Sequence, residues 1–90
     1  MKVNVYSMRD KLSGYLQPTF EQSDDIAIRN FSYAINKKDT LLFAAAKHFD
    51  LYKLGTFDTE TGIIEKCDNP VLIIEGLACK HEEVKESEVS

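Results

Sequence analysis

Residues 23–38 read Ser-Asp-Asp-Ile-Ala-Ile-Arg-Asn-Phe-Ser-Tyr-Ala-Ile-Asn-Lys-Lys, and they carry the clearest helical pattern in the chain. Ser23 is a favourable N-cap, and the two acidic residues after it lie in the first turn, where the helix dipole favours negative charge. Apolar side chains then recur at helical spacing, at Ala27, Phe31, Ala34 and Ile35. The two closing lysines suit a helix C-terminus. This pattern predicts one main helix over about residues 24–37.

The segment before this helix alternates with the period of a strand. Residues 2–8 place β-branched and polar side chains in turn, which predicts a strand. A polar turn with a glycine at its end follows, and residues 15–20 can return as a second, short strand. Pro18 confines that strand to a sheet edge or ends it, because proline cannot donate to a ladder.

The segment after the helix contains a second run of strands. Asp39 or Thr40 can cap a short helix over residues 41–46, although the same apolar run could form a strand. Alternation over residues 51–57, a turn at residues 58–62 and residues 63–66 predict a hairpin. Asp68, Asn69 and Pro70 are expected to break the chain. Residues 71–74, Val-Leu-Ile-Ile, suit a central strand that is buried on both faces.

This order of elements predicts an α+β fold. We expect a small, mainly antiparallel sheet of about five strands, with one main helix and one short helix packed on one face. Ninety residues correspond to one domain, which we place at residues 1–78. Residues 79–90 form an acidic tail with almost no apolar side chains, and we expect this tail to be disordered or a frayed helix.

Composition limits the compartment and the cofactors. No stretch is apolar for long enough to span a membrane, and residues 1–6 do not resemble a signal peptide, so we expect a cytoplasmic protein. Cys67 and Cys79 could form one disulfide, but two free thiols in a reducing compartment fit better. A metal site that combines them with His48 and His81 would need ligands at irregular separations. We therefore expect no metal and no cofactor.

The sequence holds no motif for catalysis. It lacks a nucleophile elbow, a glycine-rich phosphate loop, a zinc-protease motif and a carboxylate pair in a motif context. The adjacent Asp24 and Asp25 are explained by the helix dipole, and neither histidine has a sequence partner that would make it a base. We expect that the protein is not an enzyme, unless distant residues meet in space.

The charges divide unevenly along the chain, which has a net charge of −4. Residues 1–53 hold eight Lys and Arg against six Asp and Glu, whereas residues 54–90 hold three against nine. Single-stranded nucleic acid needs cations for its phosphates and flat rings for its bases. The candidate nucleic-acid-binding residues are Tyr6, Arg9, Lys11, Tyr15, Arg29, Lys37 and Lys38.

Several of these residues also have a structural explanation. Tyr6 and Tyr15 could be cross-strand packing partners, and Phe20, which interleaves with them, could pack under the helix start. Lys37 and Lys38 could simply complement the helix C-terminus. Dedicated nucleic-acid binders are usually basic overall, whereas this chain is acidic.

A partner surface is a further possibility. An exposed edge strand near Pro18 and the apolar residues 71–74 could pair across a two-fold axis, and a second subunit would enlarge a small core. We expect a homo-oligomer, most simply a dimer.

Four segments of the sequence are similar to one phage family. Residues 1–15, 18–22, 27–31 and 49–62 resemble, in order, the small nonstructural protein of microviruses, single-stranded-DNA phages, especially of their gokushovirus branch. We expect no match in the tail after about residue 78. The resemblance implies a protein that is absent from the mature virion and acts in the host cytoplasm. It also implies binding of single-stranded DNA during viral genome synthesis or packaging, and it implies no catalytic residue.

A different class of function stays open beside it. The chain could be a protein-interaction module that engages the phage replication initiator, a procapsid component or a host factor without touching DNA.

Overall fold

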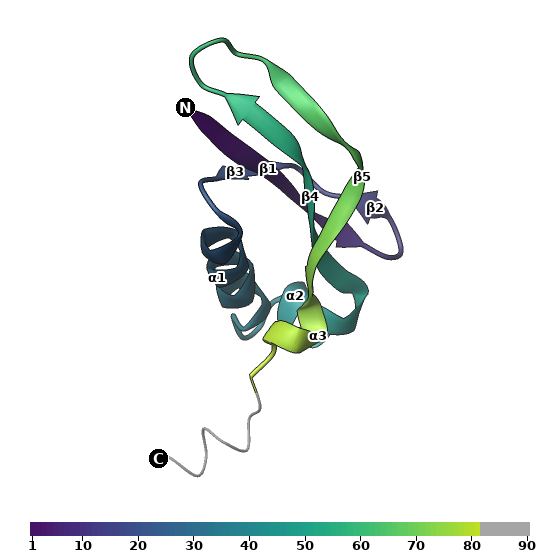
Figure 1. The fold of residues 1–90 in the computed structure, drawn as a ribbon. Coiled ribbons are helices and arrows are strands. Elements are labelled where there is room, and N and C mark those ends of the chain that lie inside the picture. Colours follow the sequence, from purple (N-terminus) through teal and green to yellow (C-terminus); the bar gives the residue numbers. More distant parts are fainter. Residues whose placement is uncertain (82–90) are drawn as a thin grey trace.

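The computed structural model of this protein describes residues 1–81, and it combines an antiparallel sheet with one long helix and several short ones (Figure 1). The elements follow one another as β1 (Lys2–Asp10), β2 (Gly14–Tyr15), β3 (Thr19–Glu21), α1 (Asp24–Ile35), α2 (Leu41–Ala44), the 3-10 helix η1 (Ala46–His48), β4 (Phe49–Asp58), β5 (Ile64–Glu75) and α3 (Gly76–Cys79). Within the described part of the chain, no helix is long and apolar enough to cross a membrane.

The sheet has five strands in the order β2-β1-β4-β5, with β3 also paired to β1, and all its pairings are antiparallel. The predicted α+β fold with about five strands is thus confirmed, but the strands are divided differently. The predicted strand at residues 15–20 is two short strands, β2 and β3, because the chain leaves the ladder around Pro18. The predicted strands at residues 63–66 and 71–74 belong to one long strand, β5.

The expected break at residues 68–70 is a bulge inside β5. Lys53 of β4 pairs with Val71, and Gly55 pairs with Lys66. Residues 67–70 of β5 therefore stand opposite one β4 residue, Leu54. The polar residues and the proline leave the ladder as predicted, but the strand resumes on the same partner.

The prediction that residues 71–74 form a central strand is wrong. β5 lies at the edge of the sheet, and Val71 and Leu72 are 48% and 46% exposed. Only Ile73 and Ile74 pack against the core. An apolar run has the same sequence signature in both positions, because the run itself does not specify which strands pair with it or what packs on its faces.

The main helix forms as predicted and ends slightly earlier. The Ser23 side chain accepts a hydrogen bond from the backbone N–H of Ile26, which caps α1. The helix ends at Ile35, so the two lysines follow it rather than closing its last turn. The apolar run after it is helical, since Thr40 caps α2 through the N–H of Phe43. The short helix α3 was not predicted.

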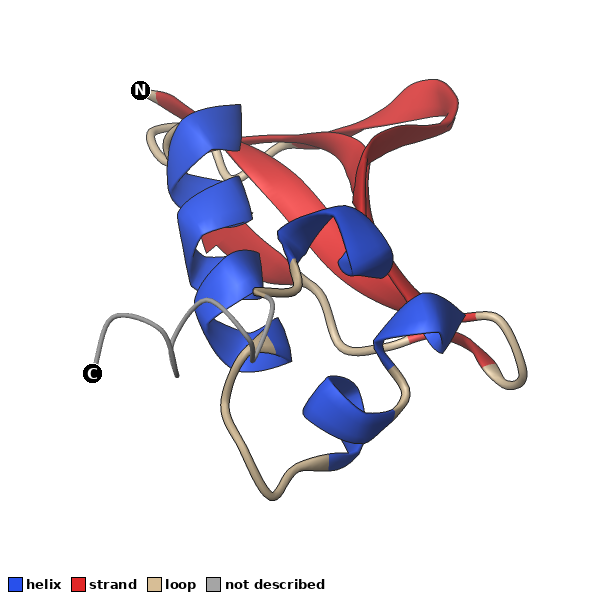
Figure 2. Cartoon of the chain, turned by 90° about the horizontal axis from the view of Figure 1, so that it is seen from below, coloured by secondary structure: helices blue, strands red, loops and turns tan. Residues whose placement is uncertain are grey.

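The core lies between α1 and one face of the sheet, and the short helical segments gather near one end of it (Figure 2). The buried cluster consists of Tyr6, Ala27, Phe31, Ile35, Ala46, Phe49, Leu51 and Cys79. Burying a large apolar side chain contributes about 1.5–3 kcal/mol, so the large members of this cluster each stabilise the fold on that scale. Cys79 belongs to this core, although the sequence placed it in the tail. The rest of the predicted tail, from residue 82 onward, lies outside the described residues.

Tyr6 ties the sheet to the start of α1. Its side chain is fully buried, and its hydroxyl donates to a carboxylate oxygen of Asp24 and accepts from the Asn4 amide. Burial, followed by the hydrogen bond to Asp24, raises the pKa of Tyr6 from 10.0 to about 12.

Substitution of Gly55 by alanine should strongly destabilise the protein. A Cβ at this position would overlap the backbone carbonyl of Glu65, which cannot move without breaking the β4–β5 ladder. We expect Gly55→Ala to lower the free energy of unfolding in urea by about 2–4 kcal/mol. Gly62→Ala is the matched control, since it meets only open space and should cost about 1 kcal/mol for its positive φ. Equal urea midpoints for the two variants would contradict this account of Gly55.

Tyr6 should make stability fall in alkali. Its pKa is higher in the folded state than the usual 10.0, so its contribution is complete below pH 10 and is lost as pH rises toward about 12. We expect the free energy of unfolding to decline over this range more steeply for the native protein than for Tyr6→Phe. Parallel pH curves for the two proteins would show that Tyr6 is not the titrating group.

Candidate nucleic-acid interface

The two faces of the sheet differ, and Tyr6 identifies the one that meets the helix, because its hydroxyl contacts Asp24 of α1. Since side chains alternate along a strand, Val5 and Ser7 point to the other side of β1. We call this side, which faces away from α1, the outer face. Residues directly opposite each other on antiparallel strands share a face, so the ladder registers identify the other side chains on it.

A first pair of rings on the outer face joins β2 to β4. Tyr15 lies opposite Arg9, and Tyr52 lies opposite Ser7. The two tyrosine ring centroids are 5.5 Å apart at an interplanar angle of 79°. The guanidinium carbon of Arg9 is 5.7 Å from the centre of the Tyr15 ring, within the range of a cation–π contact. Tyr15 is 46% exposed, so part of this ring is accessible to a ligand.

A second pair of rings joins β3 to β4 on the same face. Phe20 lies opposite Val5, and Phe57 lies opposite Val3. Their ring centroids are 5.4 Å apart at an interplanar angle of 68°, which is an edge-to-face contact. Phe20 is 50% exposed. It packs on Phe57 and not under the start of the helix.

Lys66 adds a positive charge near these rings. It lies opposite Gly55, which is itself opposite Val5, so the register places Lys66 on the outer face. Its side chain is exposed. Within the described part of the chain, the outer face therefore carries two cations, Arg9 near the tyrosines and Lys66 on the β5 side of Gly55.

Lys11 has a structural role beside this face. Its Nζ lies 3.6 Å from a carboxylate oxygen of Asp50 and donates to the backbone carbonyl of Lys47 at 3.0 Å. Asp50 is buried, and its other oxygen accepts from the backbone N–H of Gly76. Lys11 thus compensates a buried carboxylate, which leaves less of its charge for a ligand.

The structure divides the residues that the sequence predicted as a nucleic-acid site. Arg9 and Tyr15 lie together on the outer face, and Lys11 lies beside them. Tyr6 is a core residue whose ring offers no accessible surface. The remaining three are exposed on α1 or just after it, on the helix side of the sheet: Arg29, Lys37 and Lys38.

Sequence reasoning missed Tyr52, Phe57 and Lys66. Tyr52 and Phe57 are five residues apart, a spacing that puts two side chains on opposite faces of a regular strand. The extra residue Leu54, where the register with β1 shifts, brings them to the same face. Gly55 is a local sign of an irregular strand, but it does not specify that the register with β1 shifts by one residue.

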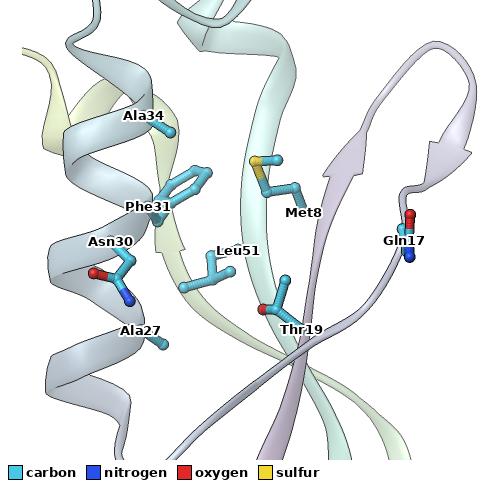
Figure 3. Close-up of a pocket in the computed structure, with 8 residues that line it drawn as sticks. All are labelled: Met8, Gln17, Thr19, Ala27, Asn30, Phe31, Ala34 and Leu51. Carbon is cyan, nitrogen blue, oxygen red and sulfur yellow. The ribbon is translucent and has the colours of Figure 1, made fainter.

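A small cavity lies on the helix side, between α1 and the segment that leads into β3 (Figure 3). Its volume is about 130 Å³, and Met8, Phe31 and Leu51 supply much of its apolar lining. The polar groups around it are two amides, Gln17 and Asn30, and the Thr19 hydroxyl. This lining holds no titratable group, so it offers no acid or base for catalysis.

The thiols and the potential metal ligands are scattered. Cys67 and Cys79 are both free, and burial raises the pKa of the Cys79 thiol. Among residues 1–81, no three His, Cys, Asp or Glu side chains come together in a way that could hold a metal ion.

Comparison with protein families gives a match to the family described as Phage ORF5 protein, over residues 3–79. Comparison with curated proteins and with solved structures gives no significant match. The resemblance to a phage protein is therefore confirmed, whereas its assignment to microviruses stays a prediction. Because the matched region spans almost the whole chain, this protein belongs to the phage ORF5 protein family.

Proposed function

We propose that this phage protein binds single-stranded DNA across the outer face of its sheet and acts as a nonstructural protein in viral genome synthesis or packaging. The proposal rests on the two ring pairs, Tyr15–Tyr52 and Phe20–Phe57, which lie on one face and each contain a half-exposed ring. Bases of any identity stack on such rings, with about 1–3 kcal/mol per stacked base. This role places the protein in the host cytoplasm and outside the mature virion.

The acidic composition limits how much the phosphates contribute. The net charge is −4, and among residues 1–81 the registers place two cations, Arg9 and Lys66, on the outer face, with Glu75 opposite Asp50 at the Arg9 end. Each neutralised phosphate adds about −0.7 to the slope of log affinity against log salt for a single strand. Two cations therefore give a slope near −1.4, so stacking has to supply most of the affinity.

Loss of an outer-face ring should weaken DNA binding. We expect Tyr15→Ala to reduce the affinity for a labelled oligothymidine by about tenfold, measured by fluorescence anisotropy at low salt. The matched control is Tyr33→Ala, which removes a tyrosine that is 74% exposed on α1. Arg9→Gln and Arg29→Gln form a second matched pair for the cations. No binding by the native protein, or equal losses for Tyr15→Ala and Tyr33→Ala, would refute the proposed interface.

A protein-interaction module is the second candidate, and the free edge of the sheet favours it. Among the described residues, β5 pairs with β4 along one edge and with no strand along its other edge. Three apolar side chains of β5 are exposed, those of Ile64, Val71 and Leu72. Exposed apolar edges pair readily with a further strand. A second copy of this chain is the simplest partner, and a replication, procapsid or host protein could use the same edge.

A charge on this edge should prevent such pairing. If the protein is a dimer through β5, Val71→Lys should shift it to monomer in sedimentation equilibrium, because lysine on an edge strand opposes strand addition. Leu12→Lys, at an 81% exposed position in the β1–β2 turn, should leave the dimer intact. A native protein that stays monomeric at high concentration would exclude self-pairing through β5.

A further inference from the structure

We propose that the outer face holds a single strand at two separate stacking positions, so that tight binding requires a strand of about three to five nucleotides. This inference deepens the proposed function and depends on it. We define the tyrosine position as Tyr15 with Tyr52, and the phenylalanine position as Phe20 with Phe57.

The ladder registers fix how far apart the two positions are. Tyr15 lies opposite Arg9 and Phe20 lies opposite Val5, both on the same edge of β1, so four residues of β1 separate the half-exposed rings. Residues in a strand rise by about 3.3 Å each, which gives a separation of about 13 Å.

The two β4 rings confirm this spacing independently. Tyr52 lies opposite Ser7 and Phe57 lies opposite Val3, which is again a separation of four residues along β1. Both ring pairs are therefore displaced by the same amount along the same strand.

A cation lies beside the part of the ladder that connects the two positions. Val5 and Ser7, which lie opposite Phe20 and Tyr52, are 7% and 1% exposed, so neither side chain projects from the sheet, and Gly55 has no side chain. Lys66 lies beside Gly55 on the neighbouring strand. A strand that bridges the two positions would thus have Lys66 available for a phosphate.

The spacing excludes adjacent bases as the occupants of the two positions. Stacked bases rise by about 3.4 Å, so 13 Å corresponds to about four steps of a stacked strand and to fewer steps of a stretched one. A dinucleotide can occupy one position at a time, whereas a strand of about five nucleotides can reach both.

The experiment measures affinity as a function of oligothymidine length, from about two to about ten nucleotides, by fluorescence anisotropy and, for the weakest complexes, by NMR titration. We expect a gain of about tenfold or more between about two and about five nucleotides, and little further gain until a second protein molecule can bind. Phe20→Leu keeps apolar packing against Phe57 but removes the flat ring. It should abolish the gain while leaving the affinity for the dinucleotide within about twofold, because the tyrosine position stays intact.

Tyr15→Leu should likewise abolish the gain with length and leave the affinity for the dinucleotide within about twofold, because the phenylalanine position stays intact. The double variant, with both substitutions, should lose binding at every length. Circular dichroism of each variant checks that it is folded, and Tyr33→Leu is the control that should keep the full gain. Binding that rises smoothly with length, and that both single variants weaken equally at all lengths, would overturn the two-position inference but leave DNA binding standing. No binding at any length would overturn the proposed function itself.

Discussion

The close approach of β5 to Gly55 is the constraint on which the sheet depends. A side chain there would overlap the Glu65 carbonyl, so only glycine lets the backbones of β4 and β5 come together at this point. The register changes on both sides of the same position: Leu54 is an extra residue relative to β1, and it faces four residues of β5. Bulges increase local twist and bend a strand, so the ladder beyond Gly55 continues in a new direction.

This irregularity also determines what the outer face presents. With a regular β4, Tyr52 and Phe57 would lie on opposite sides of the sheet, and Phe57 could not meet Phe20. Tyr15 and Phe20, in the first half of the chain, are also five residues apart, and a regular strand would place them on opposite faces too. There the departure of the chain from β1 around Pro18 lets each ring pair separately with β1. Two local interruptions, one around a proline and one beside a glycine, thus place four rings on one face.

Features that depend on residues close together in the chain could be predicted from the sequence, whereas features that depend on pairing between distant segments could not. The α1 helix was predictable because its cap, its dipole charges and its apolar stripe lie within a few turns of one another. Arg9 and Tyr15 were predictable because they meet across a short turn. Pairings across more than forty residues leave no local pattern, so Tyr52 was not found and the edge position of β5 was misjudged. Tyr6 was misassigned because an alternating pattern does not say which side of a strand the helix will cover.

An acidic protein that binds DNA would have to rely on a different balance of forces from a basic one. With Arg9 and Lys66 as the cations of the outer face and a net charge of −4, long-range attraction to the phosphates is weak, and a shallow salt dependence follows. Stacking on Tyr15 and Phe20 acts only at contact and only on bases that are not already paired, because a duplex keeps its bases stacked on each other. On the proposed function, low charge therefore favours single strands over duplex, since it removes the sequence-independent attraction that both would share.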